Sequence, residues 1–450
     1  GRMGTKIDVT VSDTLGAMMD VASEYEREKI VLLYEEEILE AVGREEFGEG
    51  LFDSVRVLAE KRVEDASERE VKLRAFEALA IMRRMNTGFP LDRAMTVSEV
   101  LDAAFSVALP TQQQELCMLL EKDIINAVFE NQESSRALND ALRLICTRRG
   151  GELKDPEAAW RAFTALAALA PEFSGDRSAE AVPVAKVLDA AFSSAPRQNH
   201  SSICILYEDA IHEAALKAAE PSETLERAVR LICTHRIHRA QPDPLATWRA
   251  FEVYSILTYG AQAGKADVLR ALEDMTSTSI DLRIRALEVV TAYFREDEDN
   301  RLYSAYRDRW VSAIVSEADT WIRETAETTA KPLITIQPSQ TLLYEAPLLR
   351  AAVFDLNEHA ALLGEIERLE TRLRAMRLNL DSIDPRKLTL MTQEINDYLE
   401  RSKSPAVQRE LARMVEENLP KEARQRMMDE GLRIYDRSAT AGGRQTADRE

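Results

Sequence analysis

Apolar residues recur along most of the chain at spacings of three and four, the pattern of a helix that buries one face. Between residues 96 and 170 this pattern predicts four helices, at about 96–108, 111–131, 134–149 and 155–170. Asp155 followed by Pro156 is typical of a helix start, because proline at the first helical position loses no hydrogen bond. Gly150 and Gly151 predict the end of the third helix. The short connections favour antiparallel helical hairpins.

Parts of this pattern return later in the chain at a nearly constant offset of about 87 residues. The recurring segments are VLDAAFS at 100–106 and 187–193, RLICT at 143–147 and 230–234, and WRAF at 160–163 and 248–251. A more diverged version, with Arg74-Ala75-Phe76 in place of the last segment, precedes them. One offset shared by separate segments indicates a tandem repeat.

We therefore predict an all-α fold of tandem four-helix repeats, either an α-solenoid-like array or a series of bundles. A C-terminal helical hairpin or bundle follows the repeats. The predicted divisions are copy one at 1–95, copy two at 96–182, copy three at 183–262, a degenerate fourth copy at 263–330, a linker at 331–341, a C-terminal helical module at 342–436 and a disordered tail at 437–450.

The C-terminal module contains an apolar stripe on a predicted helix at about 357–379. Its members share spacings of three and four: Leu362, Ile366, Leu369, Leu373 and Met376. This spacing is typical of a helical hairpin or a coiled coil. The stripe is therefore expected either to pack inside the chain or to form an oligomer with another copy.

The composition supports helix and narrows the partners. Glycine (16) and proline (15) are scarce among 450 residues, and the net charge is −20. Such a charge disfavours binding to a phosphate backbone and suits partners with a basic surface. The chain has no run of 18 apolar residues and no signal-peptide pattern at its start, so we expect no membrane insertion. Its many arginines and alanines are typical of GC-rich bacterial genomes, which favours a bacterial cytoplasmic protein or an effector delivered to a host cell.

The cysteines occupy two repeat positions. They are Cys117 and Cys204 at the first position, and Cys146 and Cys233 at the second. Copy one has Val31 at the first position and Ala59 at the second, so both positions accept small apolar residues. We expect these cysteines to pack in the core. A disulfide between helices two and three of one copy and a metal site are the alternatives.

A glutamate shares the apolar stripe of the second helix in every copy, at Glu35, Glu121 and Glu208. A carboxylate on a buried stripe needs a partner. Two sets of arginines are also present in every copy: Arg56, Arg143 and Arg230 on the third helix, and Arg74, Arg161 and Arg249 on the fourth. We expect an ion pair within each copy between the glutamate and one of these arginines, with a structural role.

Four recurring aromatic residues complete the predicted core. Trp160 and Trp248 follow the Asp-Pro caps, and Phe105 and Phe192 belong to the VLDAAFS segments. Their recurrence in matching places indicates a role in the fold.

The function predicted from the sequence is that of a non-catalytic scaffold or adaptor that binds protein partners. The chain carries no phosphate-binding loop, dinucleotide motif or zinc-protease motif, and its five histidines suggest no catalytic pairing. We therefore expect no cofactor, no metal and no catalytic residue. The alternative is a helical enzyme whose active site consists of scattered acidic residues. Nucleic-acid binding through arginine-rich helix ends such as Arg148-Arg149 is disfavoured by the net charge.

Overall fold

The computed structural model describes residues 10–88, 94–171, 178–218, 222–239, 243–294, 300–328, 336–377, 384–402 and 405–433. Every regular element within these ranges is a helix, so the chain is all-α, as predicted. It divides into two compact units, one of residues 1–235 with 256–261 and one of residues 236–255 with 262–450. The predicted tail at 437–450 and residues 331–335 of the predicted linker lie outside the described residues.

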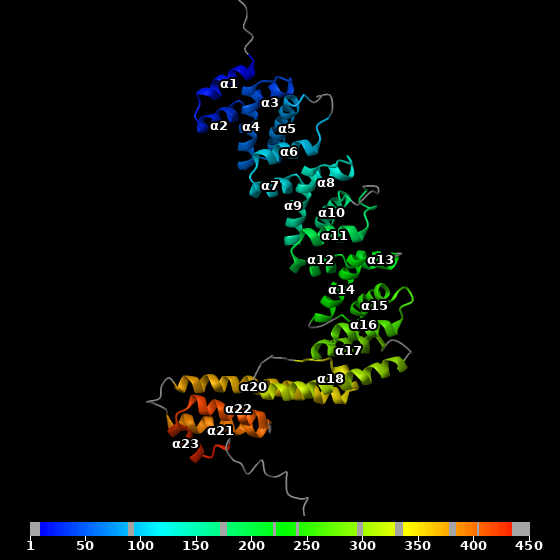
Figure 1. Ribbon diagram of the computed structural model, residues 1–450, viewed down its shortest axis with the longest axis vertical. Coiled ribbons are helices and arrows are strands. Elements are labelled where there is room, and N and C mark those ends of the chain that lie inside the picture. The colour runs from blue at the N-terminus through cyan, green and yellow to red at the C-terminus, as the bar shows by residue number, and fades with distance from the viewer. Residues whose placement is uncertain are drawn as a thin grey trace, which may run out of the picture. The chain divides into compact units, whose positions relative to one another are not determined.

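The helices are drawn in chain order in Figure 1. The first unit contains α1 (Val11–Val21), α2 (Glu24–Leu33), α3 (Glu35–Gly43), α4 (Glu49–Glu64), α5 (Arg69–Asn86), α6 (Val97–Val107), α7 (Pro110–Leu119), α8 (Glu121–Phe129), α9 (Arg136–Glu152), α10 (Pro156–Ala168), α11 (Val184–Ser194), the 3-10 helix η1 (Arg197–Asn199), α12 (His200–Leu206) and α13 (Glu208–Lys217). The division between the units falls inside α14 (Glu223–His238) and α15 (Pro244–Tyr259). The second unit contains α16 (Lys265–Thr276), α17 (Ile280–Phe294), α18 (Asn300–Thr328), α19 (Gln340–Glu345), α20 (Pro347–Arg377), α21 (Pro385–Ser402), α22 (Pro405–Asn418) and α23 (Lys421–Asp429).

Threonine caps begin both α1 and α6. The Thr10 hydroxyl accepts a hydrogen bond from the backbone N–H of Asp13, whose carboxylate accepts one from the backbone N–H of Thr10. Thr96 and Glu99 form the same capping box at α6. Each satisfies N–H groups that a helix start leaves free. In both helices Val-Ser follows the threonine, a match between copies one and two that was missed in the sequence.

The predicted helix at 111–131 is two helices, which corrects the sequence prediction. Leu120, with φ −99° and ψ 10°, separates α7 from α8. Tyr34 and Tyr207 separate α2 from α3 and α12 from α13 with nearly the same angles. Apolar spacing continues across each break, so periodicity alone could not reveal it. Each break makes the glutamate that follows it the first residue of a helix.

Gly150 and Gly151 do not end α9, which continues to Glu152, so this prediction was wrong. The helix ends at Leu153, whose φ of 50° places it in the left-handed region. Gly150 instead allows a close approach, because a Cβ there would lie 2.6 Å from the Cβ of Ala195. Asn199 donates to the backbone oxygens of Gly150 (2.8 Å) and Gly151 (3.0 Å).

The apolar stripes of the first unit meet in two extended clusters. Phe76 lies fully buried in the cluster built by α1 to α7, and Phe163 lies fully buried in the cluster built by α6 to α12. Residues of α6 belong to both clusters, for example Ala103 to the first and Leu101 to the second. One helix therefore joins two parts of a continuous core.

In the second unit, α20 begins at Pro347, earlier than the sequence pattern predicted. Its stripe residues Leu362, Ile366, Leu369 and Leu373 are buried against α21, α22 and α23. The stripe therefore packs within the chain, which was one of the two predicted arrangements. Before α19, Ile336 is held to Asn357 of α20 by two hydrogen bonds of 3.1 and 2.9 Å.

Candidate binding surface

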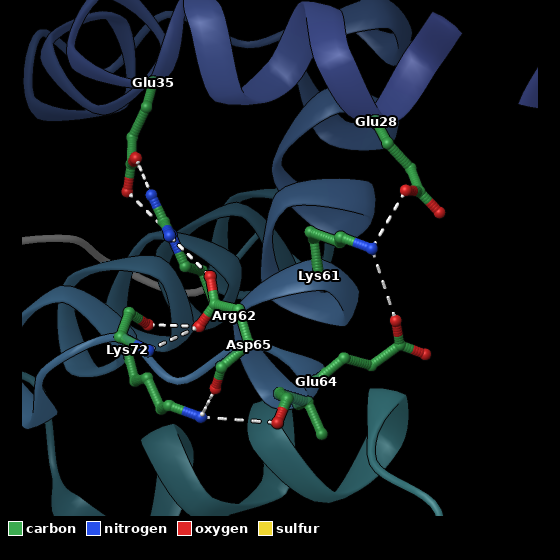
Figure 2. Close-up of polar contacts among 9 residues, drawn as sticks. Glu28, Glu35, Lys61, Arg62, Glu64, Asp65 and Lys72 are labelled. Atoms are coloured by element: carbon green, nitrogen blue, oxygen red, sulfur yellow. Dashed lines mark hydrogen bonds and ion pairs between the residues drawn. The ribbon is translucent and has the colours of Figure 1, made fainter. Parts of the chain in front are cut away.

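The glutamate of copy one is paired with an arginine of α4. Glu35 begins α3, where the free N–H groups of a helix start favour a carboxylate. Arg62 Nε donates to Glu35 Oε1 at 3.3 Å, a terminal nitrogen bonds the other carboxylate oxygen, and the second terminal nitrogen reaches Asp65 at 2.5 Å. The side chains of Arg62 and Glu35 are each 15% exposed. Figure 2 shows the Arg62 guanidinium with its bonds to Glu35 and Asp65.

Hydrogen bonds in this network keep its groups charged. Burial opposes the charge on Arg62, yet its bonds to two carboxylates raise its pKa. Burial also opposes the charge on Asp65, but hydrogen bonds from Ser67 and Arg62 lower the pKa of that carboxyl. Lys72 donates to the backbone oxygens of Asp65 (2.8 Å) and Val63 (3.3 Å). The network thus joins α3, α4 and the turn into α5.

Copy two repeats the pair. Glu121 begins α8, and Arg149 Nε donates to its Oε1 at 3.0 Å while a terminal nitrogen bonds the other oxygen. The bond to Glu121 raises the pKa of Arg149. Arg62 and Arg149 are separated by the repeat offset, and Arg236 stands at the corresponding sequence position in copy three. This recurrence in the sequence was the signal that could have identified the partner.

The arginines chosen from the sequence are not the partners of Glu35 and Glu121. Arg56 contacts Asp53 and Glu60 on its own helix, and Arg74 contacts the exposed Glu36. All six chosen arginines are exposed: Arg56, Arg143, Arg230, Arg74, Arg161 and Arg249. The prediction assumed one continuous second helix. The break before the glutamate directs its carboxylate instead to the later arginine of the third helix, on α4 or α9.

The four cysteines are fully buried and unbonded to one another: Cys117, Cys146, Cys204 and Cys233. Burial raises the pKa of the thiols of Cys117 and Cys204 to about 12. It raises the pKa of the thiols of Cys146 and Cys233 further. Nucleophilic or metal-binding cysteines need the thiolate form, so these environments suit packing.

The recurring aromatic residues differ in burial. Trp248 is 2% exposed and its ring stacks on Tyr293, with 3.9 Å between centroids. Trp160 is half-buried and packs against the ring of Tyr207 at 4.3 Å. Phe105 is half-buried as well, although the sequence placed it in the core.

Phe105 borders an open cavity of about 630 Å³ lined by α6, α7 and α9. In the first unit, α6 and α7 each pack against α9 (Figure 1). Polar groups form most of the cavity wall: Asp102, Gln113, Arg136, Asp140, Arg143 and Thr147. Asp102 and Phe105 belong to the VLDAAFS segment, and Arg143 and Thr147 to the RLICT segment. Members of two recurring segments thus line one groove, which we call the α6–α9 groove.

A second cavity, of about 850 Å³, lies in the second unit between α17, α20 and the segment 336–341. Burial raises the pKa of Glu288 at its edge, although the backbone N–H of Ser339 donates to this carboxylate. Arg350 and the exposed ring of Phe354 lie across the cavity wall. The cavity therefore combines one carboxyl with a raised pKa, one cation and an apolar surface.

Comparisons add no assignment: no protein-family model, no curated protein and no solved structure matches this chain. Among the described residues no group of three or more histidine, cysteine or acidic side chains is placed to hold a metal ion. In the same ranges no helix is long and apolar enough to cross a membrane.

Proposed function

We propose that this chain is a non-catalytic scaffold that binds partner proteins along tandem four-helix repeats of about 87 residues. The repeats would form an α-solenoid-like or multi-bundle array, whose stacked helices expose long grooved surfaces. The three separated segments that recur at one offset support this architecture. The matching breaks before Glu35, Glu121 and Glu208 support it independently.

One observation carries the binding function. Asp102 and Arg143 recur as Asp189 and Arg230, and all four side chains are exposed. Buried members of the same segments, such as Leu101 and Ile145, are explained by packing in the core. Packing does not account for an exposed acid and an exposed arginine at matching positions. Exposed charged residues of this kind are typical of surfaces that contact another molecule.

The net charge of −20 favours a partner with a basic surface, because opposite charges accelerate encounter. Basic side chains of the partner would contact the recurring aspartates, and its acidic side chains the recurring arginines. Alternation of both charges along one groove gives selectivity more than affinity, since exposed pairs each contribute at most about 1 kcal/mol.

The test is capture of partners on the immobilised full chain, followed by crosslinking and mass spectrometry. The variant Asp102→Lys with Arg143→Glu reverses both recurring charges of copy two without changing the net charge. The matched control is Asp319→Lys with Arg323→Glu, an exposed pair on α18 that does not belong to the recurring segments. We expect a stoichiometric partner that crosslinks near α6 and α9 and is lost only with the first variant. Equal capture by both variants, or no stoichiometric partner, would contradict the proposal.

The second candidate function is an enzyme with an acidic site, which the cavity beside Glu288 favours. A carboxyl with a raised pKa in a cavity is a candidate general acid. A screen of small molecules for thermal stabilisation of the full chain would test it, with Glu288→Gln as the comparison. A compound that stabilises the wild type and fails with this variant would support a site there. A compound that stabilises both proteins equally would count against it.

A further inference from the structure

The α6–α9 groove has a counterpart in copy three at the same sequence offset. Asp102, Phe105 and Arg143 recur unchanged as Asp189, Phe192 and Arg230. Four other wall positions differ between the copies: Gln113 becomes His200, Arg136 becomes Glu223, Ala137 becomes Thr224 and Asp140 becomes Arg227. We call the three unchanged residues, Asp102, Phe105 and Arg143 in copy two and their counterparts in copy three, the frame of the groove. The two copies therefore have the same frame and different side chains around it.

In copy three, Arg227 lies over the aromatic ring of this frame. Its guanidinium carbon is 4.7 Å from the centroid of the Phe192 ring. A terminal nitrogen donates to His200 Nδ1 at 3.2 Å, and the His200 ring packs on Phe192 with 4.8 Å between centroids. The hydroxyl of Thr224 donates to Asp189 at 2.5 Å. The chain thus supplies its own guanidinium and its own hydroxyl donor to the frame.

In copy two both internal groups are missing. Asp140 stands where Arg227 stands, and Ala137 where Thr224 stands. Within the described residues, no cation lies over the Phe105 ring and no hydrogen bond reaches the carboxylate of Asp102. The open cavity of about 630 Å³ occupies this place, and Asp140 adds a second carboxylate to its wall.

One hydrogen bond from a side chain to the backbone is present at the edge of the groove in both copies. Gln113 Nε2 donates to the backbone oxygen of Ala108 at 3.3 Å, and His200 Nε2 bonds the corresponding oxygen of Ala195 at 3.1 Å. Both copies therefore keep this bond to the backbone beside the groove. Because the surroundings match in this respect, the guanidinium that copy three places on Phe192 indicates the kind of group that the groove of copy two can bind.

We propose that the α6–α9 groove of copy two binds an arginine side chain of a partner protein. The guanidinium lies over Phe105, as Arg227 lies over Phe192, and its N–H groups pair with Asp102 and Asp140. This inference rests on the proposed scaffold function and names the chemical group that the surface recognises. Arginine suits the site better than lysine, because a planar guanidinium stacks on an aromatic ring while it binds carboxylates at its edge.

The arginines already in the wall are compatible with this ligand. Arg136 pairs with Asp140 at 3.6 Å and its side chain is 96% exposed, so the incoming guanidinium can displace it at small cost. Arg143 Nε donates to Asn139 on its own helix. Its counterpart Arg230 is present in copy three together with Arg227, so an arginine at this position does not exclude a second guanidinium.

The corresponding place in copy one is closed by close helix packing. Gly16 stands at the position of Asp102, and Gly50 at the position of Ala137. A Cβ on Gly50 would lie 2.5 Å from the Cα of Gly16, so α1 and α4 meet backbone to backbone. Met19, which replaces Phe105, is 6% exposed. We therefore expect one arginine site per chain.

The test measures binding of a blocked pentapeptide, Gly-Ser-Arg-Ser-Gly, to the full chain by saturation-transfer NMR at about 150 mM salt. The same peptide with lysine at its centre is the matched probe. We expect saturation transfer to the arginine methylenes, weaker transfer with the lysine peptide, and a dissociation constant raised about tenfold by Phe105→Leu. Equal binding of the two peptides, or none of the arginine peptide, would overturn the inference.

Two reciprocal variants use the difference between the copies. Asp140→Arg supplies copy two with the internal guanidinium of copy three, so we expect loss of peptide binding with an unchanged or higher melting temperature. Arg227→Asp opens copy three, and we expect two peptides per chain where the wild type binds one. Circular dichroism confirms that each variant folds, and Arg227→Ala replaces Arg227→Asp if the latter unfolds. Undiminished binding to folded Asp140→Arg would overturn the inference.

The outcomes separate this inference from the scaffold function. Partner capture that depends on Asp102 and Arg143, together with an absence of peptide binding, would retain the scaffold and reject the arginine site. Peptide binding without any captured partner would retain the site and reject the scaffold.

Discussion

At the scale of single residues, the ion pairs Glu35–Arg62 and Glu121–Arg149 were predicted only in part from the sequence. The sequence identified the glutamates and the need for a partner, because a carboxylate on an apolar stripe must be compensated. It did not identify the partner, because a pair depends on the direction of the helix that carries it. The break at Tyr34 or Leu120 sets that direction, and its apolar spacing resembles that of an unbroken helix.

Arg62→Leu should destabilise the chain, because it leaves Glu35 and Asp65 half-buried without their cation. We expect a loss of roughly 2 kcal/mol in the free energy of unfolding, below the value for fully buried pairs because water reaches this one. Urea unfolding followed by circular dichroism measures it. Arg56→Leu on the same helix is the control, with an expected loss under about 0.5 kcal/mol. Equal losses would show that Arg62 has no special role.

Glu288→Gln should change stability with pH. The folded-state pKa of Glu288 lies above its usual value of 4.5, so the folded chain binds the proton more tightly than the unfolded chain. The stability from this proton is complete below pH 4.5 and is lost as pH rises through the folded pKa. Glutamine retains an acceptor for Ser339 without charge, so we expect melting about 1–2 °C higher than wild type at pH 7. This difference should shrink as the pH falls through the folded-state pKa toward 4.5. A variant that melts lower than wild type at every pH would contradict the assignment.

At the scale of elements, local sequence signals predicted the first residue of a helix better than its last residue. The Asp-Pro start of α10 was recognised because its chemistry is local, with the Asp155 side chain accepting from the N–H of Ala158. The end of α9 was misplaced because Gly150 serves a contact with Ala195, which is distant in the sequence. Tertiary contacts of this kind leave no local pattern, and the α6–α9 groove, which joins two distant segments, was missed for the same reason.

Gly150→Ala and Gly151→Ala should have opposite effects, although the residues are neighbours in α9. A Cβ at Gly150 collides with Ala195, and we expect a loss of about 1–3 kcal/mol from overpacking. A Cβ at Gly151 meets nothing within 4 Å, so alanine should add up to about 1 kcal/mol through helix propensity. Thermal melting of both variants checks this. Two losses of similar size would show that the close approach to Ala195 is not the cause.

For the whole molecule, charge governs association. The chain carries −20 at pH 7 and its isoelectric point is about 5.0. Like-charged molecules repel one another, and this repulsion vanishes where the net charge is zero. We expect a single monodisperse species by light scattering at pH 7.5 and low salt, and larger particles as the pH approaches 5.0. Stable large particles at pH 7.5 would indicate self-association through a specific surface.

Arg227 over Phe192 has a consequence for how such a chain can change through evolution. Under the proposed repeat architecture and arginine site, a duplicated segment begins with two identical sites, and a substitution that supplies an internal guanidinium closes one of them while the surrounding residues stay the same. Reverse substitution would reopen it, and neither step requires a change in the helices. The valency of the chain can therefore rise or fall through surface mutations while the fold is inherited intact.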